Sequence, residues 1–352
     1  MSSPESSQTE LCCSIIVPVY NGALVIERCL NALAMQSVSP ESYEVIVVND
    51  GSHDLTAERV RAWSQNHPEF QLQMIEQENA GPAAARNYGA SIARGKILVF
   101  TDADCRPIPT WLASIQCPFD DDQRVVAVMG AYLSEQSPAA ARFAQLEFEE
   151  RYVLMSSHEK LDLIATYSAA FDRQVFLNAG GFDPTFPEAN NEDVEFSYRL
   201  SEQGYRMVFA PDAQVLHEHD TGWMQYARTK FSRAYWRTVV LLRHPAKAIK
   251  DSYTPQTLKL QILLAPLVPL GCLLAVVEDS LAWLWLAVPF LLTTTPLTFF
   301  ALRRKPSVAI WAPWGLWVRS MVFALGVAWA LAHRIFSLSL PESKENENLR
   351  RV

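Results

Sequence analysis

The stretch Lys96-Ile-Leu-Val-Phe-Thr-Asp-Ala-Asp104 decides the fold, because a short apolar run leads directly into two carboxylates. Residues 96–100 have the composition of a buried strand. If the chain stays extended beyond them, Asp102 and Asp104 point to the same side. Open α/β sheets bind ligands at the carboxyl ends of their strands. Two carboxylates in that place can hold a hard divalent cation, which in turn binds a diphosphate.

Three more strand patterns precede this stretch, and a helical pattern follows each of them. The strands are predicted over residues 14–19, 43–48 and 72–75. Gly81-Pro82 marks the start of a helix, because proline fits the first helical turn. Apolar strands that alternate with helices indicate an α/β, Rossmann-like fold with a mostly parallel sheet covered on both faces. The loops after the strands then surround one crevice.

The middle of the chain has a more mixed pattern. It predicts strands and helices over these residues: strands 125–132, 163–171 and 207–210, helices 139–155 and 193–203. Leu24 in the first helix and Val153 in the 139–155 helix are expected to face the core. The charged run Glu147–Arg151 is expected to form the solvated face of its helix.

Composition excludes several classes of protein. The net charge is −8 and no basic-aromatic stripe suits nucleic acid, so no nucleic-acid partner is expected. The six cysteines form no CxxC pair, which indicates reduced thiols in a cytosolic setting. The polar, acidic N-terminus lacks the basic region of a signal peptide.

Long apolar segments near the C-terminus indicate a membrane protein. Residues 258–277 and 281–302 each have the length of a bilayer span. A third segment, residues 308–332, contains Arg319, so either a span or a re-entrant or interfacial helix fits it. Basic residues lie before the first span and after the second, which places the preceding domain in the cytoplasm of a multi-pass plasma or inner-membrane protein.

These patterns divide the chain into five segments. A basic-aromatic connector with Trp223, Arg233 and Trp236 is predicted to be an amphipathic helix at the membrane interface. The segments are a flexible N-terminus (1–11), an α/β domain (12–220), the connector (221–256), a region of two or three transmembrane helices (257–335) and a polar tail (336–352).

Seven motifs follow one another in order through the α/β domain. They are Ser14-Ile-Ile-Val-Pro-Val-Tyr-Asn21, Val47-Val-Asn-Asp-Gly-Ser52, Asn79-Ala-Gly-Pro-Ala-Ala-Ala-Arg-Asn-Tyr-Gly89, Ala93-Arg-Gly95, Thr101-Asp-Ala-Asp104, Gly180-Gly-Phe-Asp183 and Asn191-Glu-Asp-Val-Glu-Phe-Ser-Tyr-Arg199. Together they resemble the family 2 glycosyltransferases of GT-A fold, over about residues 12–219. The apolar segments more loosely resemble the C-terminal anchors of membrane-associated members.

The resemblance implies a nucleotide-sugar donor, with UDP-sugars favoured. Tyr20 offers a ring face to the base, and Asp50 can accept a hydrogen bond from an imide N–H. Gly81 is expected to direct backbone N–H groups at an anion, and Arg86 to reach the ribose-phosphate side. The remaining donor-binding residues implied are Pro18, Asn21, Gly51, Ser52, Asn79, Asp102 and Ala103.

The resemblance also implies a divalent cation, Mg²⁺ or Mn²⁺. Asp104 is the expected direct ligand, and Asp102 contacts the ribose or the metal. Cys105 is interpreted as a small filler, because hard cations avoid thiols. Either His217 or His219 can be a further ligand, and the sequence does not choose between them.

Asp193 is the expected general base of an inverting transfer, with Glu192 beside it to position the acceptor. The acceptor is expected to be a lipid-linked or membrane-proximal glycan, in a setting such as cell-envelope polysaccharide synthesis. Gln225-Tyr-Ala-Arg228 continues with Thr229, not the tryptophan of polymer synthases, which favours transfer of a single sugar.

Two other functions are weighed against this one. A nucleotidylyltransferase is expected to have a glycine-rich, basic loop after the first strand, and Pro18-Val-Tyr-Asn21 is not such a loop. A non-catalytic membrane scaffold with a degenerate domain has no need to keep Asp102, Asp104 and Asp193 together.

Overall fold

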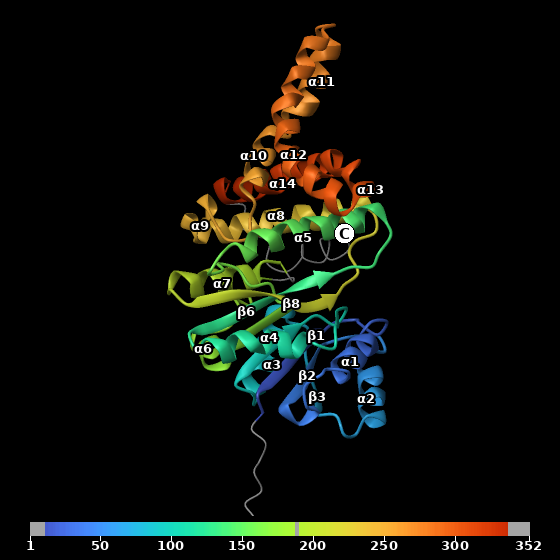
Figure 1. The fold of residues 1–352 in the computed structure, drawn as a ribbon, viewed down its shortest axis with the longest axis vertical. Helices are drawn as coiled ribbons and strands as arrows, with labels where there is room; N and C mark the ends of the chain where they lie inside the picture. The colour runs from blue at the N-terminus through green and yellow to red at the C-terminus, as the bar shows by residue number, and fades with distance from the viewer. Residues whose placement is uncertain (1–10, 187–189, 337–352) are drawn as a thin grey trace, which may run out of the picture.

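The computed structural model describes residues 11–186 and 190–336 (Figure 1). The predicted flexible N-terminus and polar tail therefore lie outside the described residues, apart from Leu11 and Phe336. The sheet and its helices make up one half of the molecule. The apolar C-terminal helices make up the other half, and two long helices lie between the halves.

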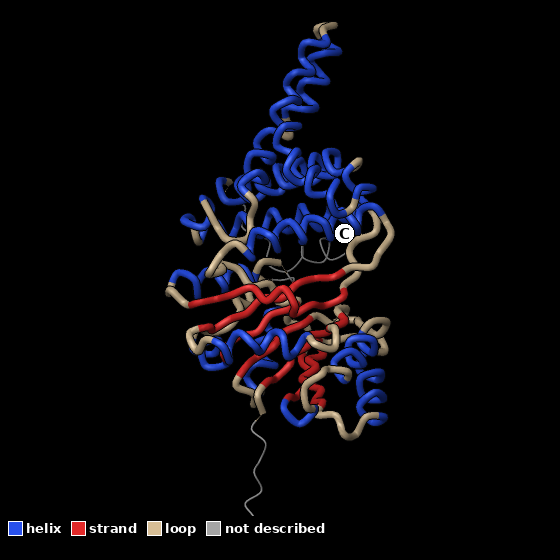
Figure 2. The backbone as a smooth tube through the Cα atoms, in the orientation of Figure 1, coloured by secondary structure: helices blue, strands red, loops and turns tan. Residues whose placement is uncertain are grey.

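Eight strands form one sheet in the order β3-β2-β1-β4-β7-β6-β8-β5 (Figure 2). Their bounds are β1 (Cys13–Val19), β2 (Tyr43–Asp50), β3 (Leu72–Gln77), β4 (Ile97–Thr101), β5 (Arg106–Pro107), β6 (Val125–Leu133), β7 (Ser168–Asp172) and β8 (Arg206–Leu216). The first four run parallel, as predicted, whereas β7 is antiparallel to both β4 and β6. The sheet is therefore mixed. The strand predicted over 163–171 forms only from Ser168 onward.

Helices cover the sheet and connect its strands. They are α1 (Ile26–Ala34), η1 (Pro40–Ser42), α2 (Thr56–Asn66), α3 (Pro82–Ile92), α4 (Trp111–Asp121), α6 (Arg173–Asn178) and α7 (Glu192–Glu202). Helix α1 buries Ile26, Leu30 and Leu33 at helical spacing. Leu24 precedes the helix and is 84% exposed, so the prediction that it faces the core is wrong.

Helix α5 (Ala139–Ser156) lies between the sheet and the apolar helices (Figure 1). The prediction that Glu147–Arg151 is solvated is wrong, because Glu147 and Arg151 are buried. Glu147 is bound by Lys230 at 2.8 Å and by Arg319 at 2.7 Å, two residues far along the chain. Val153, predicted to be inward, is 53% exposed. A helix covered on two sides has no broad solvated face, so periodicity alone misplaced these residues.

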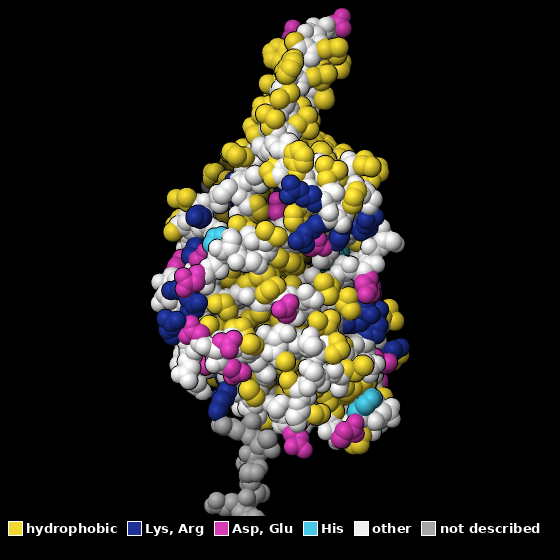
Figure 3. Space-filling model, in the orientation of Figure 1, with side chains coloured by type: hydrophobic (Ala, Val, Ile, Leu, Met, Phe, Trp, Pro, Cys, Tyr) yellow, Lys and Arg dark blue, Asp and Glu magenta, His cyan; other side chains and the backbone are white. Residues whose placement is uncertain are grey.

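The C-terminal part of the chain is helical throughout its described residues. Its elements are α8 (Trp223–Arg243), α9 (Pro245–Ile249), α10 (Gln256–Leu264), α11 (Leu267–Val277), η2 (Leu281–Ala287), α12 (Val288–Arg304), α13 (Pro306–Ala309) and α14 (Ala312–Ile335). Three helical segments are long and apolar enough to cross a membrane: Gln256–Val277, Leu281–Arg304 and Ala312–Ile335. Helix α11 projects away from the body, and hydrophobic side chains cover this projection (Figure 3).

Helix α14 differs from the projecting segments, because it lies along α8 and α5 (Figure 1). A Cβ on Gly315 would lie 2.8 Å from the ring of Phe143 on α5. A Cβ on Gly326 would lie 2.8 Å from the carbonyl oxygen of Phe231 on α8. These two glycines allow close approach, and Arg319 between them binds Glu147. The third apolar segment therefore packs on the sheet-bearing half over much of its length.

Candidate active site

The two carboxylates that follow β4 lie in a turn. The N–H of Cys105 donates to the carbonyl of Asp102 at 3.0 Å. The expectation of an extended chain is therefore wrong, and the two side chains have different partners. Asp102 binds Arg86, whereas Asp104 lies near His217. The turn therefore separates the two carboxylates: Asp102 is partly buried against Arg86, and Asp104 is more exposed and lies beside His217.

Arg86 connects β4 to the start of α7. Its guanidinium donates to Asp102 Oδ1 at 2.8 Å and to Glu192 Oε1 at 2.7 Å, and only 2% of Arg86 is exposed. Within the described residues, Glu192 Oε2 has no hydrogen-bond partner. Phe100 on β4 and Phe196 on α7 pack into a shared cluster with Phe182, which fixes the two ends of this bridge. Arg86 is therefore a buried link between acidic groups.

His217 and Asp104 face each other without a direct hydrogen bond. Nδ1 of His217 is 3.7 Å from Asp104 Oδ2, and it is buried with no hydrogen-bond partner among the described residues. Tyr132 stacks on the imidazole at 4.5 Å and fixes its orientation. Burial lowers the pKa of His217 despite the neighbouring Asp104, which keeps a ring nitrogen available as a ligand. His219 Nε2 instead pairs with Gln145 at 2.9 Å, so the geometry favours His217.

This pair suits a divalent cation. A carboxylate oxygen and a neutral imidazole are both ordinary metal ligands, and the 3.7 Å gap leaves the buried Nδ1 without another partner. Cys105 is the third potential ligand in the cluster. Burial raises the pKa of its thiol well above the ordinary value, so Cys105 stays protonated. This supports its interpretation as a filler.

Asp193 begins helix α7 and lines a cavity beside Asp102. Its Oδ2 accepts a hydrogen bond from the Thr166 N–H at 3.2 Å. Burial raises the pKa of Asp193, and burial with the adjacent Asp193 raises the pKa of Glu192 to about 7. Glu192 is 1% exposed and held by Arg86, whereas Asp193 is the more open of the two. The geometry therefore favours Asp193 over Glu192 as the residue that meets an acceptor.

The loops after β1 and β2 are tied together at the same edge of the sheet. The Asn21 N–H donates to Ser52 Oγ at 2.9 Å. Tyr20, next to Asn21, is 49% exposed, and Pro18 lies near the end of β1. Gly51 adopts φ +72, and a Cβ there would lie 2.8 Å from the Asn79 backbone nitrogen. Glycine is therefore required at this turn.

Asp50 holds the loop that precedes α3. Its carboxylate accepts hydrogen bonds from Gln77 at 2.7 Å, from Ala80 at 2.9 Å and from the Gly81 N–H at 3.0 Å. The N–H of Gly81 is thus directed at Asp50, and the expectation that it faces a bound anion is wrong for this structure. Ala103 lies inside the turn between the two carboxylates. Roles for these residues in nucleotide binding remain predictions.

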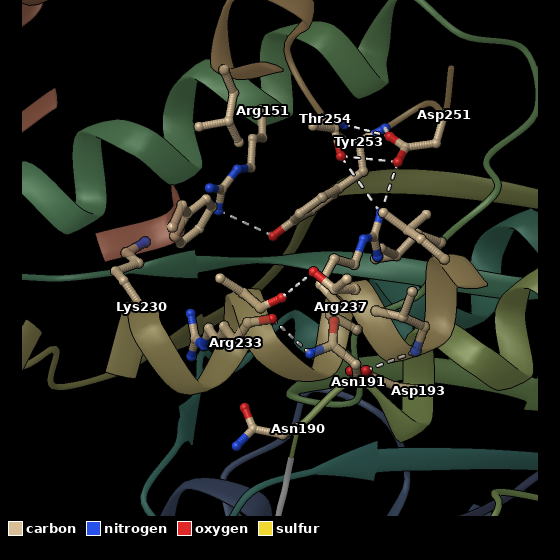
Figure 4. Close-up of a pocket in the computed structure, with 18 of the residues that line it drawn as sticks. Arg151, Asn190, Asn191, Asp193, Lys230, Arg233, Arg237, Asp251, Tyr253 and Thr254 are labelled. Atoms are coloured by element: carbon tan, nitrogen blue, oxygen red, sulfur yellow. Dashed lines mark hydrogen bonds and ion pairs between the residues drawn. The ribbon is translucent and has the colours of Figure 1, made fainter. Parts of the chain in front are cut away.

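A cavity of about 320 Å³ extends from Asp102 and Asp193 toward the apolar helices (Figure 4). Sequence reasoning missed Arg151, Tyr253 and Thr166 among its lining residues. It noticed the basic residues of α8 and assigned them to the membrane interface, but Lys230 and Arg237 line the cavity instead. The helical spacing of Lys230, Arg233 and Arg237 is the signal that could have placed them on one face.

The fold and the acidic loop cluster define a GT-A transferase. A mannosyltransferase from Pyrobaculum calidifontis, solved in complex with GDP-Man and Mn²⁺, matches with a TM-score of 0.57 at 23% identity, covering 94% of this chain and 88% of that one. Two family models match, "Glycosyl transferase family 2" over residues 14–177 and "Glycosyl transferase family group 2" over residues 97–332. The chain belongs to the family 2 glycosyltransferases.

Curated relatives agree with this assignment. The glycosyltransferase AglE of Haloferax volcanii is 31% identical over 58% of this chain and 66% of its own length. Validoxylamine A glucosyltransferase of Streptomyces hygroscopicus subsp. limoneus is 27% identical over 57% of this chain and 50% of its own length. The pre-mycofactocin glycosyltransferase of Mycobacterium tuberculosis is 27% identical over 69% of this chain and 50% of its own length. The chain spans only half to two thirds of these relatives.

Proposed function

We propose that this protein transfers one sugar, with inversion, from a nucleotide-diphosphate sugar to an acceptor at a membrane. The observation that carries the proposal is the pairing of Asp104 with His217 beside the turn whose other carboxylate, Asp102, lines one cavity together with Asp193. The P. calidifontis protein binds GDP-Man and Mn²⁺, which supports a nucleotide-sugar donor and a metal. A uracil base, which family 2 enzymes favour, is the first base to test.

Asp104 and His217 would hold the cation, Mn²⁺ or Mg²⁺. When bound, such an ion offsets the negative charge that develops on a leaving diphosphate. Asp102 cannot turn fully toward the same ion while it binds Arg86, so its part is to place Arg86 and the donor. Arg86 in turn keeps Glu192 in place, which leaves Asp193 free to face the acceptor.

Asp193 accepts the proton of the acceptor hydroxyl as its oxygen attacks the anomeric carbon. The bond from that carbon to the diphosphate breaks, and the nucleoside diphosphate leaves on the opposite face. The raised pKa of Asp193 suits this role, because a stronger base removes a hydroxyl proton more readily. The hydrogen bond from Thr166 fixes the direction of the carboxylate.

The membrane region anchors the enzyme through Gln256–Val277 and Leu281–Arg304, and α11 of the first segment projects from the body (Figure 1). Helix α14 is assigned to the interface between lipid and the catalytic half, because Arg319 and Gly326 along it contact α5 and α8. Basic residues on both sides of these two segments support a cytoplasmic position for the catalytic domain. Acceptors carried by the membrane reach Asp193 most directly.

A donor screen tests the proposal. Detergent-solubilised protein is given a panel of UDP-, GDP- and other nucleotide sugars with Mn²⁺ and a membrane lipid extract, and nucleoside diphosphate release is measured. We expect one donor to react, and we expect Asp104→Ala or excess chelator to abolish the release. Asp120→Ala, which removes an exposed carboxylate on α4, is the matched control and should react normally. Full turnover in excess chelator would falsify the metal assignment.

A further inference from the structure

The cavity beside Asp193 has three chemically different walls. Its inner wall, from β4 and α7, is acidic. Its middle wall, from α5 and α8, is basic, with Arg151, Lys230 and Arg233 on it (Figure 4). Its outer wall, from α8, α10 and α14, is mostly apolar, with Lys259 of α10 as the exception. Figure 1 shows that α5 and α8 lie between the sheet and the apolar helices. The three walls therefore follow one another from the sheet toward the membrane region.

Two guanidinium groups in the middle wall form no ion pair among the described residues, although, against the effect of burial, the charges of Glu147 and Glu150 help to raise the pKa of Arg151. Arg151 is 7% exposed, and its polar contact is a 3.3 Å hydrogen bond to the Tyr253 hydroxyl. Arg233 comes from α8 on the other side, and no ion pair forms with it in the described part of the chain. The neighbouring Arg237 and Lys247 are different, because Asp251 and Asp162 neutralise them.

Arg151 is buried and Arg233 is exposed, and no carboxylate binds either guanidinium directly, so both can bind an anionic ligand. The guanidinium of Arg151 also lies 5.0 Å from the centre of the Tyr253 ring, which holds it in place. Planar guanidinium groups bind phosphate through paired hydrogen bonds. The middle wall is thus suited to a phosphate group.

The outer wall belongs to the segments that are apolar enough to cross a membrane. It consists of Leu241, Leu258, Ile262, Phe323 and Val327. Leu258 and Ile262 lie in the segment Gln256–Val277, and Phe323 and Val327 lie in α14. A hydrocarbon chain in this part of the cavity continues directly into the lipid that surrounds α10.

We propose that the acceptor is a phosphate-bearing lipid whose headgroup carries the accepting hydroxyl. This rests on the proposed function. The hydroxyl meets Asp193, the phosphate lies between Arg151 and Arg233, and the hydrocarbon chain leaves between α10 and α14. A hydroxyl acceptor explains why a carboxylate base is present. A phosphate oxygen is already ionised near neutral pH and needs no base.

In the transfer step, the acceptor oxygen forms a bond to the anomeric carbon and its proton passes to Asp193. The bond between that carbon and the donor diphosphate breaks, with its electron pair going to the leaving nucleoside diphosphate. The lipid phosphate is unchanged, so Arg151 and Arg233 bind it before and after the step.

Binding measured without catalysis tests this proposal separately from glycosyl transfer. The probe is hexadecyl phosphate carrying a photoreactive group on its chain, compared with the same chain as an uncharged alcohol and with inorganic phosphate. The full-length protein in detergent is used, both as wild type and as Asp104→Ala. We expect both proteins to bind the alkyl phosphate about tenfold or more tightly than the alcohol. We expect crosslinks to residues of α10 or α14.

Three variants sharpen the result. Arg151→Gln should weaken alkyl phosphate binding about tenfold and leave nucleotide binding unchanged. Val327→Trp should fill the apolar end and remove the crosslink without a change of charge. Leu325→Trp is the matched control, because Leu325 is 57% exposed on the same helix, and it should bind normally. If Arg151→Gln fails to fold, Val327→Trp and Leu325→Trp still decide the question.

Equal binding of the alcohol and the alkyl phosphate would overturn the phosphate assignment. Competition by inorganic phosphate as effective as that by alkyl phosphate would overturn the lipid assignment. If Arg151→Gln or Arg233→Gln lost only nucleotide binding, these arginines would bind the donor. That result would also overturn the phosphate assignment. If wild type binds the lipid and no donor reacts, the proposed function fails and the binding site stands.

Discussion

The donor side and the acceptor side of the cavity are built on different principles. On the donor side, short loops from parallel strands bring Asp50, Asp102 and Asp104 to one edge through local turns and buried strands. On the acceptor side, α5, α8, α10 and α14 bring together residues that are up to 172 positions apart, such as Glu147 and Arg319. The comparison teaches that the chemistry of the donor is fixed by the sheet, whereas access for the acceptor depends on how the membrane helices pack.

Asp193→Asn should show the largest effect, and only on the chemical step. The amide keeps the shape of the side chain and removes the proton acceptor. Loss of a general base typically costs about a hundred- to ten-thousand-fold in rate. We expect kcat to fall by that factor, while donor affinity measured by nucleotide titration stays near wild type. Because the pKa of Asp193 is raised, wild-type kcat should also rise with pH through that pKa, and the variant should lose this dependence.

Near-normal turnover of Asp193→Asn with normal donor affinity would show that Asp193 only begins helix α7. Glu192→Gln would then be the next variant to measure. A loss of donor affinity in Asp193→Asn would break the division between the two sides of the cavity, since donor binding would then depend on an acceptor-side residue.

Glu147→Gln should have the next largest effect, this time on stability. Glu147 is fully buried between Lys230 and Arg319, so the amide leaves two buried cations without their carboxylate. Breaking a buried ion pair in this way costs about 3–5 kcal/mol. We expect a loss of that size in the free energy of unfolding, measured by denaturant titration in detergent.

Glu159→Gln is the control for this prediction. Glu159 pairs with Arg206 at 2.7 Å, yet its side chain is 80% exposed, so its loss should leave the free energy of unfolding nearly unchanged. Burial alone would raise the pKa of Glu147, but Lys230 and Arg319 hold it below the ordinary value. Its contribution is therefore present above the pKa of the unfolded carboxyl, about 4.3, and is lost as pH falls toward the folded pKa. Equal losses in the two variants would contradict the buried role of Glu147.

Much of the donor side could be predicted from the sequence, and the reason is physical. Strands such as Ile97–Thr101 are short, apolar and followed by turn residues, so their ends and loops are visible in the pattern. The turn at Asp102–Cys105 was missed because a hydrogen bond within four residues leaves no periodic signal. The choice of His217 over His219 depended on Tyr132 and Gln145, which lie on other elements.

The acceptor side could be predicted only in part. The apolar segments and the basic residues of α8 are evident in the sequence. Their partners are not, because Glu147, Lys230 and Arg319 form a cluster only when three distant helices meet. A charged run in a helix is normally solvated. Here the run lies under α14, and no local feature of α5 reports what covers it.

The smallest functional effect is expected from cysteine substitutions that report the membrane topology, since they lie away from the cavity. Arg319 is about 10 Å and Gly326 about 21 Å along α14 from Ala312, at 1.5 Å per residue. Both contact helices of the catalytic half, so a spanning α14 would draw that half into the bilayer.

In a background with Cys117 and Cys272 replaced by serine, cysteines are placed at Ser280, Lys305 and Ser343. We expect a membrane-impermeant maleimide on whole cells to label only Ser280→Cys, and the other two to react after permeabilisation, with turnover near wild type throughout. Labelling of Ser343→Cys from outside would mean that α14 spans the membrane. It would then not form a wall of the proposed acceptor site. Labelling of Lys305→Cys from outside would reverse the orientation of the whole enzyme.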